Sequence, residues 1–91
     1  MAYVNIGYGN VVNADKVISV TGADSAPAKR MIQTAKDNGK AIDATCGKKT
    51  KAIIIMENEM LVLSPLLPET IANRFNNQEE TVSNMSSLRE K

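Results

Sequence analysis

Three lysines lie within four positions of a short segment whose residue types suit phosphate binding. Residues 46–51 read Cys-Gly-Lys-Lys-Thr-Lys, and we call this segment the lysine loop. Clustered ammonium groups attract phosphate, Gly47 permits a tight turn, and the Thr50 hydroxyl can donate to a phosphate oxygen. A charged tip that only keeps a sheet edge soluble is the alternative explanation. The predicted phosphate-contacting side chains in this loop are Lys48, Lys49, Thr50 and Lys51.

Neither of the two glycine-containing turns has the spacing of a nucleotide-binding motif. A P-loop that ended at Gly47 would need glycine at position 42 and Ser or Thr at position 49, where Ile42 and Lys49 stand. A dinucleotide fingerprint starting at Gly7-Tyr8-Gly9 would need a third glycine at position 12, which is Val12. Both segments are therefore interpreted as turns.

The residue inventory argues against catalysis and metal binding. The chain has no histidine, which excludes Ser-His-Asp and Cys-His catalysis and every histidine-ligated metal site. Cys46 is the single cysteine. The neighbouring lysines could lower its pKa and make it a nucleophile, but the simpler interpretation is a small residue at the end of a strand. Asp43, if buried, would need a cationic or backbone partner, such as Lys40 or a loop lysine. We expect no enzyme activity, no metal, no cofactor and no small-molecule substrate.

Length and composition indicate one small domain. The chain has 91 residues, 3 % aromatic residues and a net charge of +1, so its core is aliphatic and any nucleic-acid binding depends on a local patch. A lone cysteine and the absence of a signal-peptide pattern favour the cytoplasm. The longest apolar run, residues 52–56, is too short to span a membrane, so no membrane association is expected.

Alternating and apolar runs between turn residues predict about six short strands. The strand predicted over residues 51–56 holds Ile53, Ile54 and Ile55 in succession, which indicates burial of both faces. In so thin a domain we expect another subunit to cover the second face, so these three residues are assigned to an oligomer interface. The lysine loop is expected at the tip of a hairpin. The predicted strands are residues 3–6, 11–13, 16–21, 40–45, 51–56 and 60–64.

Two helices are predicted beside these strands. Asp24 or Ser25 can cap the first helix, Pro27 falls in its first turn, and Gly39 suits its end. A shorter helix follows Pro68. The predicted fold class is α+β: a small, mostly antiparallel sheet with one central helix and a short C-terminal helix. Residues 1–76 form the predicted domain, and residues 77–91 a flexible polar tail.

Four segments of the sequence form a recognisable set. They are Asn5-Ile-Gly-Tyr-Gly-Asn10, Ser25-Ala-Pro-Ala-Lys-Arg-Met-Ile32, Ile42-Asp-Ala-Thr-Cys-Gly-Lys-Lys-Thr50 and Pro68-Glu-Thr70. Together they closely resemble the RemA-like family of bacterial extracellular matrix regulators. The resemblance covers about residues 3–75, in order and with nearly unbroken spacing.

The resemblance implies a cytoplasmic transcription regulator of biofilm matrix genes. It also implies a ring-shaped homo-oligomer with double-stranded DNA wrapped along it. The DNA-contacting arginines of the family map onto Lys16, Lys48 and Lys49 of this sequence. Lysine keeps the charge but lacks the planar guanidinium fork, so we expect phosphate binding with weaker base selectivity. The alternative is an oligomeric scaffold or protein-interaction module that does not bind DNA.

Overall fold

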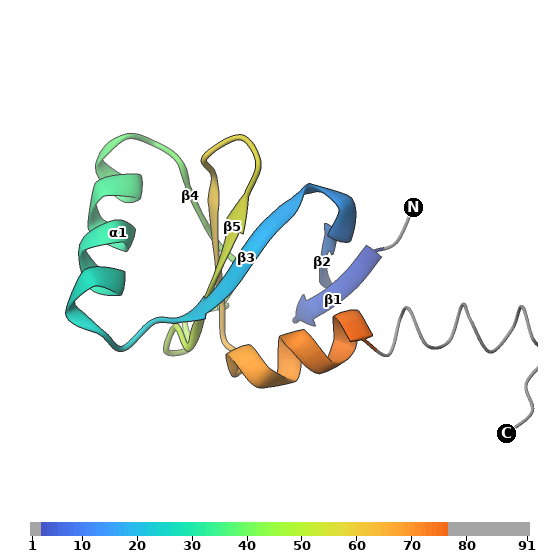
Figure 1. Cartoon of the computed structure of the whole chain (residues 1–91). Coiled ribbons are helices and arrows are strands. Elements are labelled where there is room, and N and C mark those ends of the chain that lie inside the picture. The colour runs from blue at the N-terminus through green and yellow to red at the C-terminus, as the bar shows by residue number, and fades with distance from the viewer. Residues whose placement is uncertain (1–2, 77–91) are drawn as a thin grey trace, which may run out of the picture.

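A computed structural model of the chain describes residues 3–76 and contains six strands and two α-helices (Figure 1). The tail predicted over residues 77–91 lies outside the described residues. In chain order the elements are β1 (Tyr3–Gly7), β2 (Asn10–Asn13), the 3-10 turn η1 (Ala14–Lys16), β3 (Val17–Gly22), α1 (Ala26–Asp37), β4 (Ala41–Asp43), β5 (Ala52–Met56), β6 (Leu61–Ser64) and a C-terminal helix over residues 68–76.

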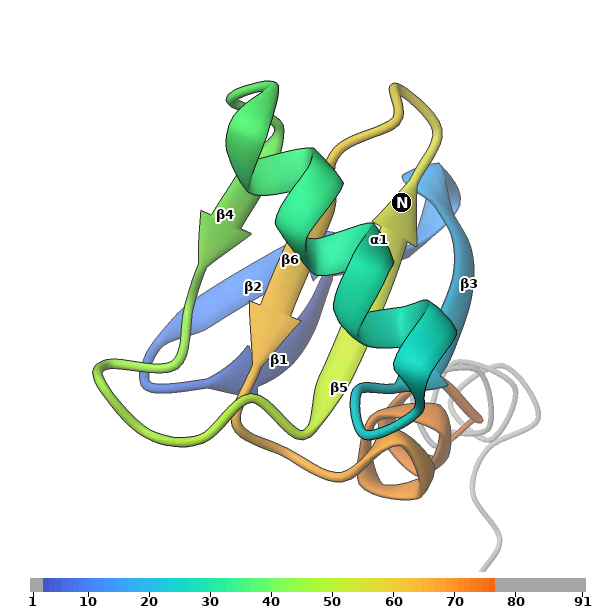
Figure 2. The ribbon, with the colours of Figure 1, turned by 90° about the vertical axis from the view of Figure 1, so that its left-hand side faces the viewer.

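The elements form three layers around a central sheet. That sheet has four strands in the order β3-β5-β6-β4. Helix α1 covers one of its faces, and the antiparallel hairpin of β1 and β2 lies against the other (Figures 1 and 2). The C-terminal helix closes one end, where the Arg74 side chain donates a hydrogen bond of 3.0 Å to the Asn5 carbonyl. The α+β prediction is confirmed, with the strands divided between two sheets.

The predicted pairing of the strands on either side of the lysine loop is wrong. Strand β4 pairs in parallel with β6, and β5 pairs antiparallel with β6, so β6 separates β4 from β5. All four residues of β6 are buried, which suits a central strand better than an edge. The lysine loop is therefore a connection across the end of β6 and not the tip of a hairpin.

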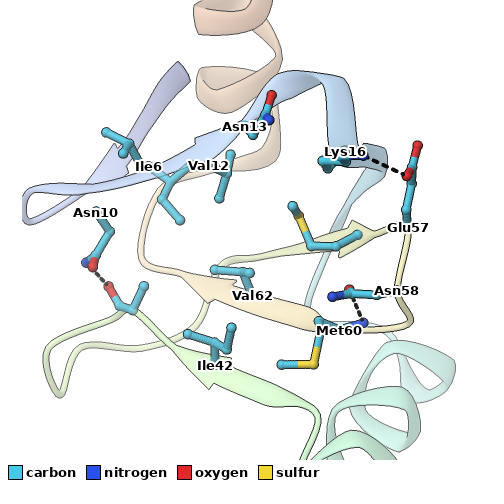
Figure 3. Close-up of a pocket in the computed structure, with 13 residues that line it drawn as sticks. Ile6, Asn10, Val12, Asn13, Lys16, Ile42, Glu57, Asn58, Met60 and Val62 are labelled. Carbon is cyan, nitrogen blue, oxygen red and sulfur yellow. Dashed lines mark hydrogen bonds and ion pairs between the residues drawn. The ribbon is translucent and has the colours of Figure 1, made fainter. Parts of the chain in front are cut away.

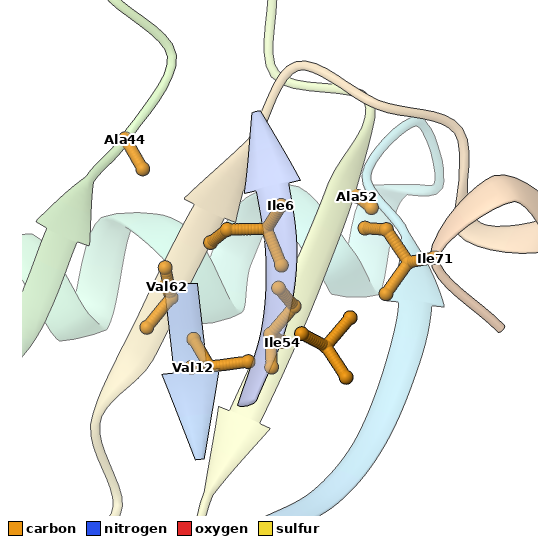
Figure 4. Packing of buried hydrophobic residues seen from close by; sticks show 8 residues of the cluster. Ile6, Val12, Ala44, Ala52, Ile54, Val62 and Ile71 are labelled. Atoms are coloured by element: carbon orange, nitrogen blue, oxygen red, sulfur yellow. The ribbon is translucent and has the colours of Figure 1, made fainter. Parts of the chain in front are cut away.

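Strand β5 buries both of its faces inside this one chain. Ile54 is fully buried and faces the hairpin, where it packs with Ile6, Val12 and Ile71 (Figure 4). Ile53 is also fully buried and belongs to a second cluster on the α1 side. The hairpin and α1 thus cover the two faces, as neighbouring layers do in a packed domain. Because the chain itself covers Ile53 and Ile54, their apolar character no longer indicates that another subunit packs over them. Ile55 is half-buried.

Helix α1 begins and ends where local chemistry predicts. The Ser25 hydroxyl, and not Asp24, caps it by accepting a hydrogen bond of 3.1 Å from the Ala28 amide. Beyond its end, Gly39 has φ +72°, a conformation that glycine adopts without strain. The buried stripe is narrow, since Ala28 and Ala35 are the buried residues of the helix. Small side chains let the helix lie close to the sheet.

Candidate nucleic-acid interface

The lysine loop begins at a turn that Asp43 stabilises. One oxygen of its carboxylate accepts hydrogen bonds from the Thr45 hydroxyl at 2.6 Å and from the Thr45 amide at 2.9 Å. These bonds, the hydroxyl first, lower the pKa of Asp43 below its ordinary value. Lys40, a suggested partner, pairs instead with Glu59 at 3.1 Å. The exposed Asp43 carboxylate therefore acts as a local brace for the loop.

Residues 45–48 form a tight turn that leaves the lysine side chains of the loop exposed to solvent. The Lys48 amide donates a hydrogen bond of 3.0 Å to the Thr45 carbonyl. Cys46 and Gly47, at the two central positions, have φ +52° and +80°, the signs that a type I′ turn requires. Cys46 is exposed and its thiol is free. It lies in this turn, three residues beyond the end of β4, and not at the end of a strand as expected.

The far end of the loop is fixed to the central sheet. The Lys51 amide donates a hydrogen bond of 2.9 Å to the Ser64 carbonyl, and the Lys51 carbonyl accepts one of 3.3 Å from the Ala23 amide. Both ends of the loop are thus tied to buried parts of the fold. The side chains of Lys48, Lys49 and Lys51 are exposed, so a fixed backbone presents three mobile ammonium groups to solvent.

The lysines share a hollow with the turn between β1 and β2. Its volume is about 460 Å³, and we call it the lysine hollow. Its lining residues are Gly7, Tyr8, Lys48, Lys49, Lys51, Pro65 and Leu66. The side chain of Asn10 joins the two segments, since its Nδ2 donates to the Gly7 carbonyl at 3.0 Å and, more weakly, to the Ala44 carbonyl at 3.5 Å. Sequence reasoning did not include Tyr8 among the site residues.

Little negative charge competes for these ammonium groups. Lys49 lies 3.9 Å from Asp24, but both side chains are about three-quarters or more exposed, so the pair contributes little to stability. Within residues 3–76, Lys48 and Lys51 have no acidic side chain at salt-bridge distance. Thr50 is half-buried between them. A phosphate can approach at least two of the three lysines without displacing a partner.

Lys16 lies at the opposite end of the central sheet. It closes the 3-10 turn before β3, where its ammonium is 3.7 Å from the Glu57 carboxylate (Figure 3). Val17 pairs with Met56 at that end of β5, whereas the lysine loop enters β5 at Ala52. A strand of five residues spans roughly 15 Å at about 3.3 Å per residue. One chain therefore does not bring Lys16 and the lysine loop together.

A second, larger hollow separates the hairpin from the β4 edge of the sheet. It has a volume of about 530 Å³ and a mainly apolar lining that includes Ile6, Val12 and Val62 (Figure 3). Lys16 and Glu57 lie at one end of it. Val11 and Ile42, two further lining residues, are 56 % and 47 % exposed. We call this feature the apolar groove.

Residues 3–76 contain neither a metal-ligating cluster nor a helix that could span a membrane. No group of three or more His, Cys, Asp or Glu side chains is placed so that it could hold a metal ion. No helix in this part of the chain is long and apolar enough to cross a membrane.

Comparison with known proteins gives the same family over most of the chain. The model of the RemA-like family, extracellular matrix regulatory protein A-like, matches residues 3–75. A relative from Lachnoclostridium phytofermentans is 60 % identical over 81 residues, which cover 89 % of each chain. Relatives from Bacillus cereus strain AH187 and Bacillus mycoides are 50 % and 49 % identical over 80 residues, covering 88 % of this chain and 92 % of each relative. The names of all three assign a regulatory role provisionally and state no target.

Proposed function

Since this chain belongs to the RemA-like family of extracellular matrix regulatory proteins, we propose that it binds double-stranded DNA as a transcription regulator. In this proposal the protein acts in the cytoplasm on biofilm matrix genes, as a ring-shaped homo-oligomer. The lysine loops of successive protomers contact DNA phosphates. Lys16 adds a second phosphate contact on each protomer.

The arrangement of the lysine loop is the observation that carries the proposal. Lys48, Lys49 and Lys51 project from a backbone that hydrogen bonds fix at both ends, and two of them have no acidic partner within residues 3–76. Phosphate binding releases counterions from DNA, and this release supplies most of the affinity of such contacts. A fixed loop also reduces the conformational entropy that binding would otherwise cost.

The lysines favour binding to phosphates over reading of bases. A guanidinium can donate two parallel hydrogen bonds to guanine, whereas an ammonium acts as a compact point charge. The positions where the family carries arginine hold Lys16, Lys48 and Lys49 in this chain. We therefore infer that sequence selectivity depends mainly on DNA shape and on the spacing of protomers.

Assembly would convert weak single contacts into strong binding. One lysine loop can offer only a few phosphate contacts, but linked loops act at high effective concentration. The apolar groove, with Val11 and Ile42 exposed at its margin, provides an apolar surface that a second copy of the chain could cover. The apolar groove, and no longer the burial of Ile53 and Ile54, is therefore the reason to expect an oligomer.

Substitution of two loop lysines tests the proposal. The variant K48A/K49A should remain folded, because both side chains are exposed and neither supports the core. We expect it to bind a labelled duplex more weakly, with a shallower slope of log affinity against log salt. Two lost phosphate contacts correspond to a slope change of about 1.8 per protomer in contact with DNA. Fluorescence anisotropy at several salt concentrations measures both quantities.

The matched control removes the same charge elsewhere. Arg30 and Lys40 line a separate hollow beside α1, so R30A/K40A lowers the net charge equally without touching the lysine loop. This control should retain most of the affinity and the salt slope. If both double variants behave alike, the loop has no specific role. If the wild-type protein shows no saturable, salt-dependent binding, the scaffold alternative replaces DNA binding.

Light scattering tests the oligomer separately. We expect a mass several times that of one 9.8 kDa chain, both with and without DNA. Because the apolar groove is the proposed contact surface, I42D should lower that mass while the monomer stays folded, since Ile42 is exposed on an edge strand. A monomeric wild-type protein would contradict the ring.

A further inference from the structure

We infer that Tyr8 is a DNA-contacting residue that packs against the deoxyribose next to the phosphate held by Lys48 and Lys49. This inference rests on the proposed DNA binding and adds a non-ionic contact to it. The observation behind it is the lysine hollow, where the exposed ring of Tyr8 lies beside three lysines that follow it by about forty residues in the sequence.

The backbone at Tyr8 presents the side chain outward at a conformational cost. Tyr8 has φ +53°, a left-handed conformation that is uncommon for bulky residues. Gly7 and Gly9 on either side have φ +114° and +77°. The Tyr8 side chain nevertheless remains 57 % exposed, so the turn gains little from burying it. A large exposed ring on a strained backbone is typical of a residue that contacts a ligand.

The surroundings of this turn hold it in place. The Ser64 hydroxyl donates a hydrogen bond of 2.9 Å to the Ile6 carbonyl, directly before the turn. The Asn5 side chain accepts a hydrogen bond of 2.7 Å from the Gly7 amide. A Cβ atom added to Gly7 would lie 3.2 Å from Pro65, which shows how closely the turn packs on the segment after β6. The backbone of the turn that carries Tyr8 is therefore held against the segment after β6, which also lines the lysine hollow.

The chemistry of the lysine hollow matches one nucleotide unit of a DNA strand. Its ammonium groups suit a phosphate, while Tyr8, Pro65 and Leu66 supply apolar contact area beside them. Basic grooves that carry aromatic side chains are characteristic of proteins that bind single-stranded nucleic acid, where the rings stack on bases. In a duplex the base faces are stacked and inaccessible, so the sugar is the apolar group next to a bound phosphate. Tyrosine is also among the side chains that commonly contact phosphate and sugar.

Salt dependence distinguishes this contact from the ionic ones. Y8A should weaken duplex binding about three- to ten-fold, the size expected for loss of one aromatic contact. Because tyrosine carries no charge, the slope of log affinity against log salt should stay at the wild-type value. K48A/K49A, by contrast, should change that slope. Y8F keeps the ring and should bind within about two-fold of the wild-type protein.

The tyrosine signal gives a second, direct measurement. The chain has no tryptophan and only two tyrosines, Tyr3 and Tyr8, so Y8F leaves Tyr3 as the one tyrosine emitter. Duplex binding should change the tyrosine fluorescence of the wild-type protein, and Y8F should lose most of that change. Light scattering of Y8A must show the wild-type mass. If Y8A dissociates, the Tyr8 side chain forms a contact between subunits, and the inference is overturned.

The outcomes separate this inference from the proposed function. Wild-type binding with an unaltered Y8A affinity and no fluorescence change overturns the role of Tyr8 alone and leaves DNA binding intact. Absence of duplex binding by the wild-type protein overturns both. A weaker Y8A with an unchanged salt slope, together with a normal Y8F, supports the sugar contact.

Discussion

Substitution of Ser64 by alanine should destabilise the fold through one small, fully buried hydroxyl. Ser64 has no exposed surface. Its hydroxyl donates a hydrogen bond of 2.9 Å to the Ile6 carbonyl and accepts one of 3.1 Å from the Leu66 amide. The first bond joins the hairpin to the central sheet, and the second holds the segment that lines the lysine hollow. S64A removes both bonds and leaves the two backbone groups behind.

The size of the effect follows from where those two groups lie. A buried polar group left without a partner costs about 1–3 kcal/mol. The Ile6 residue is fully buried, so its carbonyl bears most of this cost, whereas Leu66 is half-exposed and its amide can bind water. We therefore expect S64A to lower the free energy of unfolding by about 1–3 kcal/mol. For a domain of this size each kcal/mol corresponds to roughly 4–8 °C in Tm.

Urea and thermal unfolding, followed by circular dichroism, measure this difference. The matched control is S19A, since Ser19 is exposed on β3 and its hydroxyl makes no hydrogen bond within the described residues. Both variants must be compared with the wild type at one protomer concentration, because assembly would make stability depend on concentration. An S64A protein within about 0.5 kcal/mol of S19A would refute the argument, since changes of that size are ordinary for surface substitutions.

Two further substitutions test the parts that hold the loop and the turn. G7A should destabilise the protein by about 1–3 kcal/mol in urea unfolding, because φ +114° strains any side chain and the new Cβ would meet Pro65 at 3.2 Å; an unchanged midpoint would contradict this geometry. D43N should be less stable than the wild type at neutral pH, because the ionised carboxylate accepts both Thr45 hydrogen bonds. The folded-state pKa of Asp43 is lowered, so this advantage exists above the unfolded-state pKa and disappears as the pH falls through the folded value. The difference in unfolding free energy between D43N and wild type should therefore be smaller at pH 3 than at pH 7, and a constant difference would argue against the carboxylate.

Local signals in the sequence were sufficient for the individual elements. Helix α1 begins after a serine cap with Pro27 in its first turn and ends before Gly39, as predicted, because these signals act within a few residues. The six strands also lie close to their predicted positions. Strand pairing depends on contacts between distant segments, so the insertion of β6 between β4 and β5 was not predictable from local pattern.

The same distinction explains the candidate site. The cluster Lys48, Lys49 and Lys51 is adjacent in the sequence and was predicted directly. Tyr8 reaches the lysine hollow only because the hairpin packs across the central sheet, about forty residues away along the chain. The run that includes Ile53 and Ile54 correctly indicated a strand buried on both faces. The pattern could not say that α1 and the hairpin of the same chain cover those faces. The signal that the sequence offers for Tyr8 is an aromatic residue between two glycines.

The separation of Lys16 from the lysine loop limits how one protomer can use its positive charge. These groups lie at opposite ends of β5, roughly 15 Å apart by the length of the strand. A single phosphate cannot contact two groups that lie this far apart. In the proposed complex each protomer would therefore offer two independent contacts, and sites at this distance contribute nearly additively to affinity. A continuous basic track requires the Lys16 end of one protomer to lie near the lysine loop of the next, which makes the track a property of the assembly and not of the single chain.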